Sequence, residues 1–389
     1  MMYLVLGLLS YFLWTINKFG VESSVKTHLN KSEAMALSPV DPNSYARTDL
    51  VKTTHIHLDL EVDFTQEIFR GYVILTFEMV DPKATSVILD ARNLTISKVS
   101  EEASGQILEY ELGFPSGYGE KLEIKLPSSV SKEFKIRINY QTSPKSSALQ
   151  WLSPSLTAGK KHPYVFSQCQ AIHARSMLPC QDTPAVKAPY TATITAPQEL
   201  TILMSAVRNG DEVKDGKKVA EFTQKVPIQS YLIAIAVGAI VSRKIGPRSH
   251  VWSEEEFVEK AAFDFSETES FIETAEELCG PYVWGIYDIL VLPPSFPFGG
   301  MENPCMTFAT PTLLSGDKSN ADVVAHEIAH SWTGNLVTNV NFEHFWLNEG
   351  FTVFTERKIV GRMHGEPARH FSAILRWKDL TVSWIKIHV

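Results

Sequence analysis

The chain has 389 residues, of which 44% are hydrophobic and 21% are charged, which is the ordinary composition of a globular protein. Its length provides for two or three domains, each with enough chain for a hydrophobic core. The formal net charge of −8 gives no general attraction to phosphate backbones, which argues against a nucleic-acid partner.

The chain begins with an apolar segment, residues 1–16, that is followed by Asn17 and Lys18. The segment is short for a membrane-spanning helix, which needs about 20 apolar residues, and no positive charge precedes it as in a signal peptide. Three interpretations of residues 1–36 therefore stay open: an uncleaved membrane anchor, an atypical signal, or an extension of a soluble protein.

The cysteines bear on the compartment. The chain has four, which are too few for a disulfide framework and lack CxxC spacing: Cys169, Cys180, Cys279 and Cys305. This favours reduced thiols and a cytoplasmic protein. A membrane-anchored or secreted protein, located through residues 1–16, is the alternative.

Residues 37–240 are predicted to form a β-rich domain. In THIHLDLEVDF, residues 54–64, polar and apolar side chains alternate strictly, and one face carries Ile56, Leu58, Leu60, Val62 and Phe64. Turn signals separate six further strand-like segments: GYVILTFEMV, SVILDA, KLEIKL, FKIRINY, YTATITA and ELTILMSAV. Many short strands with tight turns predict a large antiparallel domain.

Some reactive residue types in this domain are interpreted as structural. His55, His57 and Asp59 lie on the polar face of the first strand and can bind a metal ion, but such a face is usually the solvent side of a half-buried strand. Cys169 and Cys180 are interpreted as small buried hydrophobic residues rather than nucleophiles.

Residues 241–389 are predicted to form a domain of mixed helices and strands. Residues 253–280 have helical spacing and end on Gly280, which is typical of a C-cap. Residues 287–304 are expected to form a strand that leads into a Pro/Gly-rich loop.

Two further helices are expected in this part of the chain. The first spans residues 319–335, with Ser319, Asn320 or Asp322 as its N-cap and Gly334-Asn335 as its end. The second runs from Asn348, as a cap, to Met363, and its apolar stripe consists of Val353, Phe354, Ile359 and Val360.

The motif HEIAH, residues 326–330, indicates a metal site. At i and i+4 on a helix, His326 and His330 share one face and can bind one small cation. Zinc suits neutral imidazoles, and a catalytic zinc site has three protein ligands and an open position for water. Glu327 can reach that water as a general base. Glu349 of WLNEG is the expected third ligand; eighteen residues separate it from His330, and they include a loop that can reverse the chain.

Two other stretches indicate substrate contacts. Glu302 follows two glycines in GGMEN, residues 299–303, and a carboxylate beside a zinc site can hold the free α-amino group of a peptide. Gln168 and Gln170 share a face if the chain is extended, so both amides can point into a cleft. A surface turn and a loop without substrate contact are the respective alternatives.

Taken together, GGMEN, HEIAH and the glutamate of WLNEG resemble the gluzincin aminopeptidases. Longer runs carry the resemblance over residues 37–372: SALQWLSP, FSQCQAIHAR, PCQDTP, LVLPPSFPFGGMENPCMTFATPTLLSGDKS and HSWTGNLVTN. It implies a saddle-like N-terminal β domain, a thermolysin-like α/β zinc catalytic domain and a helical C-terminal domain. It also implies a cytosolic, monomeric, bifunctional enzyme with one Zn²⁺ per chain. That enzyme would trim N-terminal residues from short peptides and hydrolyse the lipid epoxide leukotriene A(4) to leukotriene B(4).

Carried over residue by residue, the resemblance makes His326, His330 and Glu349 the zinc ligands and Glu327 the general base. Glu302 would bind the peptide amino group and take part in epoxide opening. The substrate path would be lined by Gln168, Cys169, Gln170, Pro297, Phe298, Gly299, Gly300, Met301 and Glu302.

The sequence departs from the family pattern in two places. Phe298 stands where a tyrosine is common, and after Phe371 the run SAILRWKDLTVSWIKIHV does not continue the pattern. We therefore expect an incomplete catalytic domain without the helical C-terminal domain, an oxyanion-stabilising tyrosine or the aspartate used on the epoxide. The alternative to an active enzyme is a catalytically impaired isoform or an incomplete gene model that acts at most as a binding module.

Overall fold

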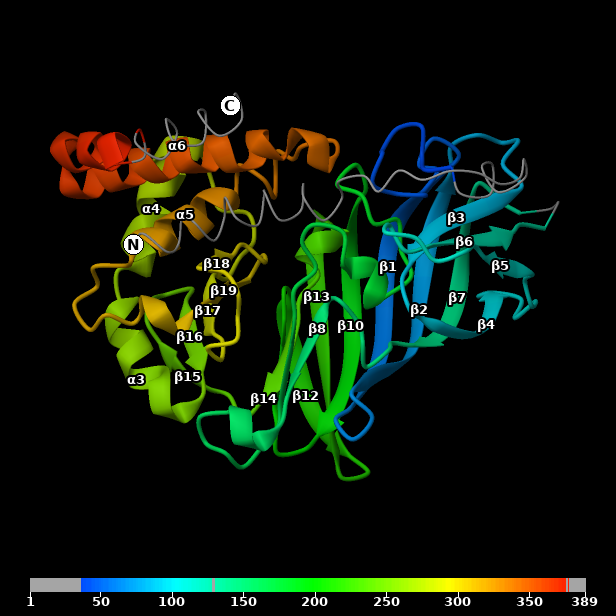
Figure 1. The fold of residues 1–389 in the computed structure, drawn as a ribbon, viewed down its shortest axis with the longest axis horizontal. Helices are drawn as coiled ribbons and strands as arrows, with labels where there is room; N and C mark the ends of the chain where they lie inside the picture. Colours follow the sequence, from blue (N-terminus) through cyan, green and yellow to red (C-terminus); the bar gives the residue numbers. More distant parts are fainter. Residues whose placement is uncertain (1–35, 128–129, 376, 378–389) are drawn as a thin grey trace, which may run out of the picture.

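The computed structural model describes residues 36–127, 130–375 and 377. The apolar segment 1–16, for which an anchor, a signal or an extension was expected, lies outside these residues, as does most of the sequence after Phe371. Among the described residues, no helix combines the length and the apolarity needed to cross a membrane. A β domain comes first along the chain and an α/β domain second, as the fold class predicted (Figure 1).

A seven-stranded sheet forms the centre of the β domain, in the order β12-β13-β10-β1-β2-β7-β4 (Figure 1). Its strands are β1 (Val51–Asp63), β2 (Ile68–Met79), β4 (Thr95–Glu101), β7 (Glu133–Gln141), β10 (Lys187–Pro197), β12 (Val207–Lys214) and β13 (Lys217–Gln229). Neighbours are antiparallel except β1 and β10, which are parallel. The prediction of an antiparallel domain was therefore wrong at the centre of this sheet. The parallel pair is possible because the long chain between β1 and β10, residues 64–186, provides the crossover that parallel neighbours need.

The two faces of β1 follow the predicted alternation. Ile56, Leu58, Leu60 and Val62 are buried on one face. On the other face polar groups bond to neighbouring strands: the Asp59 carboxylate accepts a hydrogen bond of 2.7 Å from the Tyr72 hydroxyl. The described residues contain two groups that could hold a metal ion, and neither includes His55, His57 or Asp59.

Two smaller sheets complete the β domain, with the orders β3-β6-β5 and β11-β14-β9-β8. Their strands are β3 (Ser86–Ala91), β5 (Tyr110–Leu112), β6 (Glu120–Lys125), β8 (Leu149–Leu152), β9 (Tyr164–Ser167), β11 (Thr201–Met204) and β14 (Ile235–Gly238). Short 3₁₀ turns are η1 (Pro154–Leu156), η2 (Ala174–Ser176) and η3 (Ser230–Leu232). Gln168 and Gln170 follow β9 directly, so this strand determines where the loop with the two glutamines begins.

The α/β domain is built on a five-stranded sheet in the order β15-β16-β17-β19-β18. Its strands are β15 (Val241–Lys244), β16 (His250–Ser253), β17 (Asp288–Val291), β18 (Gly300–Met301) and β19 (Met306–Ala309). Its helices are α3 (Glu255–Asp264), α4 (Thr268–Cys279), α5 (Asp322–His330) and α6 (Phe345–His364), with the 3₁₀ turns η4 (Pro311–Leu313) and η5 (Phe342–His344). The helical run predicted over residues 253–280 is divided between α3 and α4, and Gly280 ends it with a φ of 93°.

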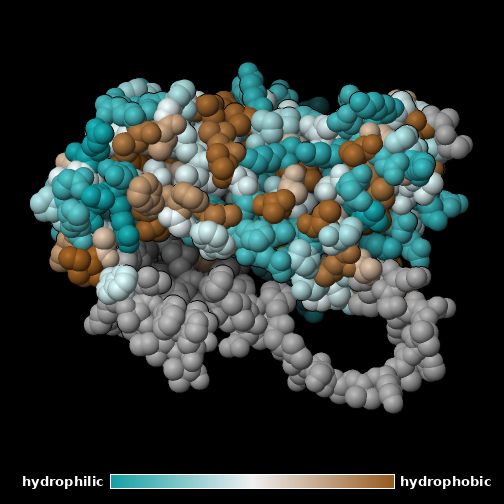
Figure 2. All heavy atoms as spheres, turned by 90° about the horizontal axis from the view of Figure 1, so that it is seen from above, coloured by the Kyte–Doolittle hydropathy of each residue, from teal (hydrophilic) through white to brown (hydrophobic). Residues whose placement is uncertain are grey.

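The apolar stripe predicted for α6 is buried only in part. Ile359 is fully buried, but Phe354, expected in the buried stripe, is 59% exposed. Trp346 and Phe351 are exposed as well. From above, the molecule shows such hydrophobic side chains interspersed with polar ones (Figure 2). The stripe is displaced because the polar Thr352 and Glu356 occupy the face of α6 that packs towards α5.

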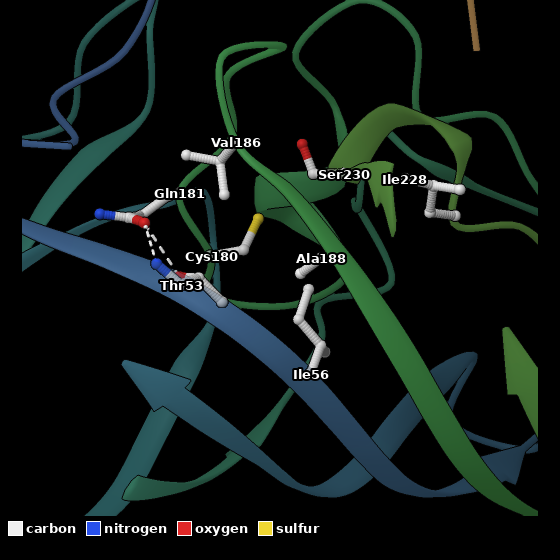
Figure 3. A pocket seen from close by; sticks show the side chains of 8 residues that line it. All are labelled: Thr53, Ile56, Cys180, Gln181, Val186, Ala188, Ile228 and Ser230. Atoms are coloured by element: carbon white, nitrogen blue, oxygen red, sulfur yellow. Dashed lines mark hydrogen bonds between the residues drawn. The ribbon is translucent and has the colours of Figure 1, made fainter. Parts of the chain in front are cut away.

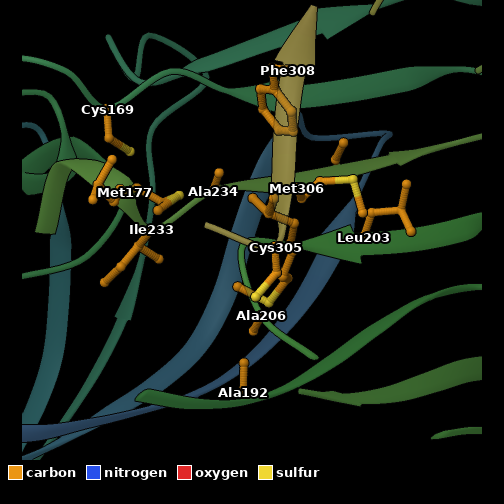
Figure 4. Close-up of a cluster of buried hydrophobic side chains, with 14 of the residues drawn as sticks. Cys169, Met177, Ala192, Leu203, Ala206, Ile233, Ala234, Cys305, Met306 and Phe308 are labelled. Carbon is orange, nitrogen blue, oxygen red and sulfur yellow. The ribbon is translucent and has the colours of Figure 1, made fainter. Parts of the chain in front are cut away.

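The hydrophobic core is continuous from one domain to the other (Figure 4). In this close-up, Ala192 and Leu203 of the β domain lie near Cys305, Met306 and Phe308 of the α/β domain. All five side chains are at most 3% exposed. Because apolar contacts join the two domains, the β domain can hold groups of the α/β domain in a defined position.

The PCQDTP loop is anchored on β1 by Gln181. Its side-chain oxygen accepts hydrogen bonds from the Thr53 backbone N–H and hydroxyl, both 2.9 Å long. Beside it lies a cavity of about 10 Å³ into which the Cys180 side chain points (Figure 3), a volume that holds at most one water molecule. Burial raises the pKa of the Cys180 thiol, which agrees with its interpretation as a buried hydrophobic residue.

A buried arginine holds this loop against the segment that contains Gln168 and Gln170. Arg175 is fully buried, and its Nε donates a 2.8 Å hydrogen bond to the Asp182 carboxylate. The Asp90 carboxylate lies 3.6 Å from the same guanidinium, which also donates to backbone carbonyls of Asn43, Tyr118 and Asp182. Each of the three guanidinium nitrogens therefore has an acceptor, which makes the buried charge tolerable.

Replacing Arg175 by methionine should lower the free energy of unfolding by about 3–5 kcal/mol, because Asp90 and Asp182 would stay buried without their cation. Urea unfolding followed by circular dichroism measures the change. The matched control is Arg243→Met, which removes an exposed ion pair with Glu259 and should cost at most about 1 kcal/mol. Equal losses in the two variants would contradict the structural role of Arg175.

Candidate metal centre

The two histidines of HEIAH face a glutamate of the next helix. His326 and His330 lie one turn apart on α5, with their Nε2 atoms 3.1 Å apart. The Glu349 carboxylate in α6 lies 3.5 Å from Nε2 of His326 and 3.8 Å from Nε2 of His330. The ligand atoms of all three residues lie within 4.8 Å of one another, so the structure brings together the three predicted metal ligands.

The helix starts differ from those predicted. Ala321 is at the N-cap position of α5, and no side chain caps it, so Ser319, Asn320 and Asp322 were wrong as caps. The α6 helix begins at Phe345, three residues before Asn348.

The early start of α6 has a local cause. The side chain of Asn341 accepts a hydrogen bond from the Glu343 N–H and starts the turn η5, which leads directly into α6. Asn348 therefore lies inside the first turn of α6 and is buried, with its side chain against Gly334.

The outer nitrogens of both histidines are already bonded, which leaves the Nε2 atoms directed at Glu349. Nδ1 of His326 lies 2.9 Å from the Glu356 carboxylate. Nδ1 of His330 lies 3.1 Å from the Thr333 carbonyl and 3.0 Å from the Thr352 hydroxyl. Partners on the outer nitrogen orient an imidazole and determine which nitrogen binds the metal.

The donor set fits zinc. The described residues contain two overlapping groups that could hold a metal ion: His326, His330 and Glu349, or Glu302, Glu327 and His330. Two imidazoles with one carboxylate is a known catalytic zinc set, whereas two carboxylates with one imidazole is less suited to this borderline-soft ion. The first group is therefore the better zinc site, and it leaves Glu302 and Glu327 for other roles.

Sequence reasoning missed Glu356 and Thr352. Their spacing was visible: Thr352 and Glu356 stand three and seven residues after Glu349, so all three share one face of α6. Helical periodicity within the WLNEG helix would therefore have found them. The apolar stripe predicted for this helix does not include them, because both side chains are polar.

Glu327 and Glu302 stand beside the predicted ligands and are buried, at 6% and 5% exposure. Burial raises the pKa of Glu327 well above its usual value, against the opposing effect of His326. Burial likewise raises the pKa of Glu302, which His330 counteracts and the charge of Glu349 reinforces. The two acids are therefore held close enough to the metal ligands to affect them electrostatically.

In the ion pair of His326 and Glu349, the pKa values of both groups are shifted in favour of the charged form. Burial disfavours a charged imidazole, but hydrogen bonds to Glu349 and Glu356 outweigh it and raise the pKa of His326 well above the usual range. Burial also disfavours an ionised Glu349, but His330 and His326 outweigh it and lower its pKa. Each group thus stabilises the charged form of the other.

The loop with the two glutamines meets the GGMEN segment. Gln170 Nε2 lies 3.4 Å from the Glu302 carboxylate, and Gln168 Nε2 lies 3.0 Å from the sulfur of Met301. Cys169, between them, is 3% exposed and belongs to the buried cluster of Figure 4. The two glutamines therefore contact the GGMEN segment, whereas Cys169 lies in the hydrophobic core.

The remaining predicted pocket residues are arranged around β18. Gly300 packs so tightly on Glu327 that a Cβ at this position would clash with its carboxylate, and Gly299 precedes it. Phe298 is partly buried and meets Phe296 edge to face at 5.9 Å. Pro297 is exposed.

Replacing Glu356 by glutamine should weaken zinc binding about 10- to 100-fold, because the amide is a poorer acceptor for Nδ1–H of His326. Competition with a chromogenic chelator measures the affinity. The matched control is Glu343→Gln, an exposed residue of η5, which should bind zinc as the parent chain does. Unchanged affinity in Glu356→Gln would show that the contact does not orient His326 for a metal.

The sequence matches two descriptions of one peptidase family. The Peptidase M1 N-terminal domain matches residues 42–232, and the Peptidase family M1 domain matches residues 263–384. The second match runs beyond Phe371, so the predicted departure from the family pattern at that residue was placed too early.

The similar proteins are aminopeptidases and leukotriene hydrolases. Leukotriene A-4 hydrolase of Xenopus laevis is 52% identical over 346 residues, which are 87% of this chain and 56% of that protein. Leucine aminopeptidase 2 of Neosartorya fischeri is 48% identical over 352 residues, which are 89% of this chain and 57% of that protein.

Solved structures agree with this. The structure of yeast LTA4 hydrolase in complex with bestatin has a TM-score of 0.83 and 42% identity, and the match covers 95% of this chain and 56% of that one. The chain thus spans a little over half the length of the proteins that it resembles. From the two domain matches and these similarities, we conclude that the chain belongs to the M1 family of peptidases.

Proposed function

We propose that this chain is a zinc-dependent aminopeptidase that removes N-terminal residues from short peptides. We also propose that the same site hydrolyses leukotriene A(4) to leukotriene B(4). The observation that carries the proposal is the convergence of His326, His330 and Glu349 beside the buried carboxyl groups of Glu327 and Glu302. Two similar proteins support it, because one is named a leukotriene hydrolase and another a leucine aminopeptidase.

The chain would bind one Zn²⁺ through His326, His330 and Glu349. When bound, zinc supplies Lewis-acid chemistry, which polarises a carbonyl or epoxide oxygen and makes water easier to deprotonate. Glu356 and Thr352 hold the two imidazoles in the orientation that this binding requires.

Glu327 acts as the general base. It follows His326 directly on α5, so its carboxylate lies next to the metal ligands without being one of the preferred set. It accepts a proton from the attacking water and later returns this proton to the leaving amine. Its contact with Gly300 holds it between α5 and the edge of the sheet.

Glu302 selects the end of the peptide. Its buried carboxylate holds the cationic α-amino group, and Gln170 lies beside it to complete the contact. Because β18 is the edge strand of its sheet, an extended peptide can lie along it with the first residue at Glu302. A substrate without a free α-amino group would leave Glu302 buried and unpaired, so cleavage is limited to the first residue.

The lipid substrate would use the aromatic wall of the same site. Phe166, Phe296 and Phe298 form a chain of edge-to-face contacts at 6.0 and 5.9 Å. Phe298 is only partly buried and can contact the hydrocarbon part of a lipid epoxide, while Phe166 and Phe296 support it from the hydrophobic core. We also propose that the enzyme is cytoplasmic and monomeric. Its four cysteines are all free thiols, which is typical of proteins in a reducing compartment.

The test is hydrolysis of an aminoacyl anilide by the zinc-loaded chain. We expect turnover that a chelator abolishes and added zinc restores. Glu327→Gln should retain zinc but lose about 100- to 10,000-fold in kcat, because the amide cannot accept the proton. Glu343→Gln, exposed and outside the site, should keep the parent kcat.

The competing interpretation is a catalytically impaired chain that acts at most as a binding module. The observation in its favour is that the chain spans a little over half the length of its relatives. A folded chain that holds one zinc ion but turns over neither aminoacyl anilides nor leukotriene A(4) would support it and would refute the enzymatic proposal.

Gly300→Ala gives an independent test of the site. The added Cβ would displace the Glu327 carboxylate, so we expect kcat to fall at least about 100-fold while the zinc content stays near one per chain. In Gly350→Ala the added Cβ meets open space on α6, and activity should be unchanged. Equal activity of the two variants, measured with the same anilide, would contradict the placement of Glu327 against Gly300.

A further inference from the structure

The turn after α5 connects several parts of the metal centre. This 333–338 turn is closed by a 2.8 Å hydrogen bond from the Gly334 N–H to the Val337 carbonyl. Its first carbonyl, of Thr333, lies 3.1 Å from Nδ1 of His330. The side chain of Asn335 donates a 2.9 Å hydrogen bond to the backbone carbonyl of Glu302. A displacement of the turn would therefore move groups that contact both a metal ligand and the GGMEN segment.

The turn also determines where α6 approaches α5. Gly334 has a φ of 124°, which favours glycine, and a Cβ there would clash with the side chain of Asn348. Asn348 immediately precedes Glu349, so the third metal ligand is carried by the residue that follows this close contact. The turn thus contacts, or adjoins, elements that carry His330, Glu302 and Glu349.

Two side chains of the β domain hold this turn from outside the α/β domain. The ammonium of Lys187 donates to the carbonyls of Asn335 and Leu336, at 3.2 and 2.7 Å. The amide of Gln229 donates to the carbonyls of Gly334 and Asn335, at 3.1 and 3.4 Å, and to the Thr338 hydroxyl.

Lys187 and Gln229 form one unit. Lys187 begins β10 and Gln229 ends β13, and the two residues are direct partners in the register of these antiparallel strands. Side chains of such partners extend from the same face of a sheet, so both reach the turn together. They contact the carbonyls of three successive residues, which fixes the orientation of these peptide planes.

Burying the side chains of Lys187 and Gln229 costs the protein desolvation free energy. Gln229 is fully buried, and burial lowers the pKa of Lys187. An ammonium withdrawn from water needs acceptors, and here backbone carbonyls of another domain provide them. Holding the two domains together does not by itself require polar groups, because a continuous hydrophobic core already joins the domains.

We propose that Lys187 and Gln229 are positioning residues that hold the 333–338 turn and thereby orient His330 and Glu302 for metal and substrate. This inference rests on the proposed function, because it assigns to the β domain a share in building the zinc site. The side-chain hydrogen bonds of both residues go to the turn, so both act through it.

The test uses the full chain with Lys187→Met, Gln229→Leu and the double variant. Zinc affinity is measured by chelator competition, and kcat and KM with an aminoacyl anilide. We expect the double variant to bind zinc about 10-fold more weakly and to lose kcat more than it gains in KM. Lys187→Arg keeps donors for the carbonyls. On a logarithmic scale, its zinc affinity should lie at least halfway from that of Lys187→Met to that of the parent chain.

The matched control is Gln224→Leu. Gln224 is a buried glutamine of the same strand β13, and it donates to the Ser205 carbonyl and to the sulfur of Cys305 rather than to the turn. If loss of a buried hydrogen bond alone mattered, Gln224→Leu would lower the melting temperature and zinc affinity as much as Gln229→Leu does. We expect comparable melting temperatures and a zinc affinity that changes in Gln229→Leu only.

The outcomes separate this inference from the proposed function. Parent-like zinc affinity in the double variant overturns the positioning role, whether or not the parent chain turns over substrate. A parent chain that binds zinc without turnover refutes the enzymatic proposal, while weaker binding in the double variant still supports the role of the turn. A parent chain that binds no zinc overturns both.

Discussion

The candidate metal centre concentrates acidic groups in a space with little access to water, and the rest of the structure depends on how this charge is compensated. Four glutamates gather around two imidazoles: Glu302, Glu327, Glu349 and Glu356 around His326 and His330. Burial raises the pKa of Glu302 and Glu327, and neighbouring carboxylates reinforce this rise against the opposing effect of the histidines. Burial also disfavours an ionised Glu349, but His330 and His326 outweigh it and lower its pKa. A divalent cation held by the histidines and Glu349 would offset the charge directly.

The architecture serves this concentration of charge. The helices α5 and α6 pack side by side and contribute residues at helical spacing, so five of the six groups come from one interface. Glu302 arrives from the edge of the five-stranded sheet, and Gln170 reaches it from the loop after β9 in the other domain. Arg175 and Gln181 anchor the loops behind these glutamines, while Lys187 and Gln229 contact the turn that follows α5. The site is therefore built by both domains, although its metal ligands belong to one.

Many features followed from local pattern. The alternation in residues 54–64 predicted the buried face of β1, because side chains of a strand point to opposite sides at every step. The spacing of His326 and His330 predicted a shared helical face, and the type of these residues predicted zinc. The errors arose where two signals competed. Asn348 looked like a helix cap, but Asn341 starts the preceding turn, so the helix begins earlier and Asn348 is buried. The parallel pairing of β1 and β10 has no signature in the sequence of either strand. Which strands become neighbours, and whether they run in the same direction, depends on the crossover between them.

Periodicity and residue chemistry were thus sufficient to predict the helix that carries the two histidines, the acid beside them and the glutamate that faces them from the next helix. They could not predict which face of that next helix turns inward, or that β10 and β13 reach the turn after α5. These relations join residues far apart in the chain, and each depends on how whole elements pack. Short-range rules describe the conformation of a segment, whereas packing alone decides which distant segment it meets.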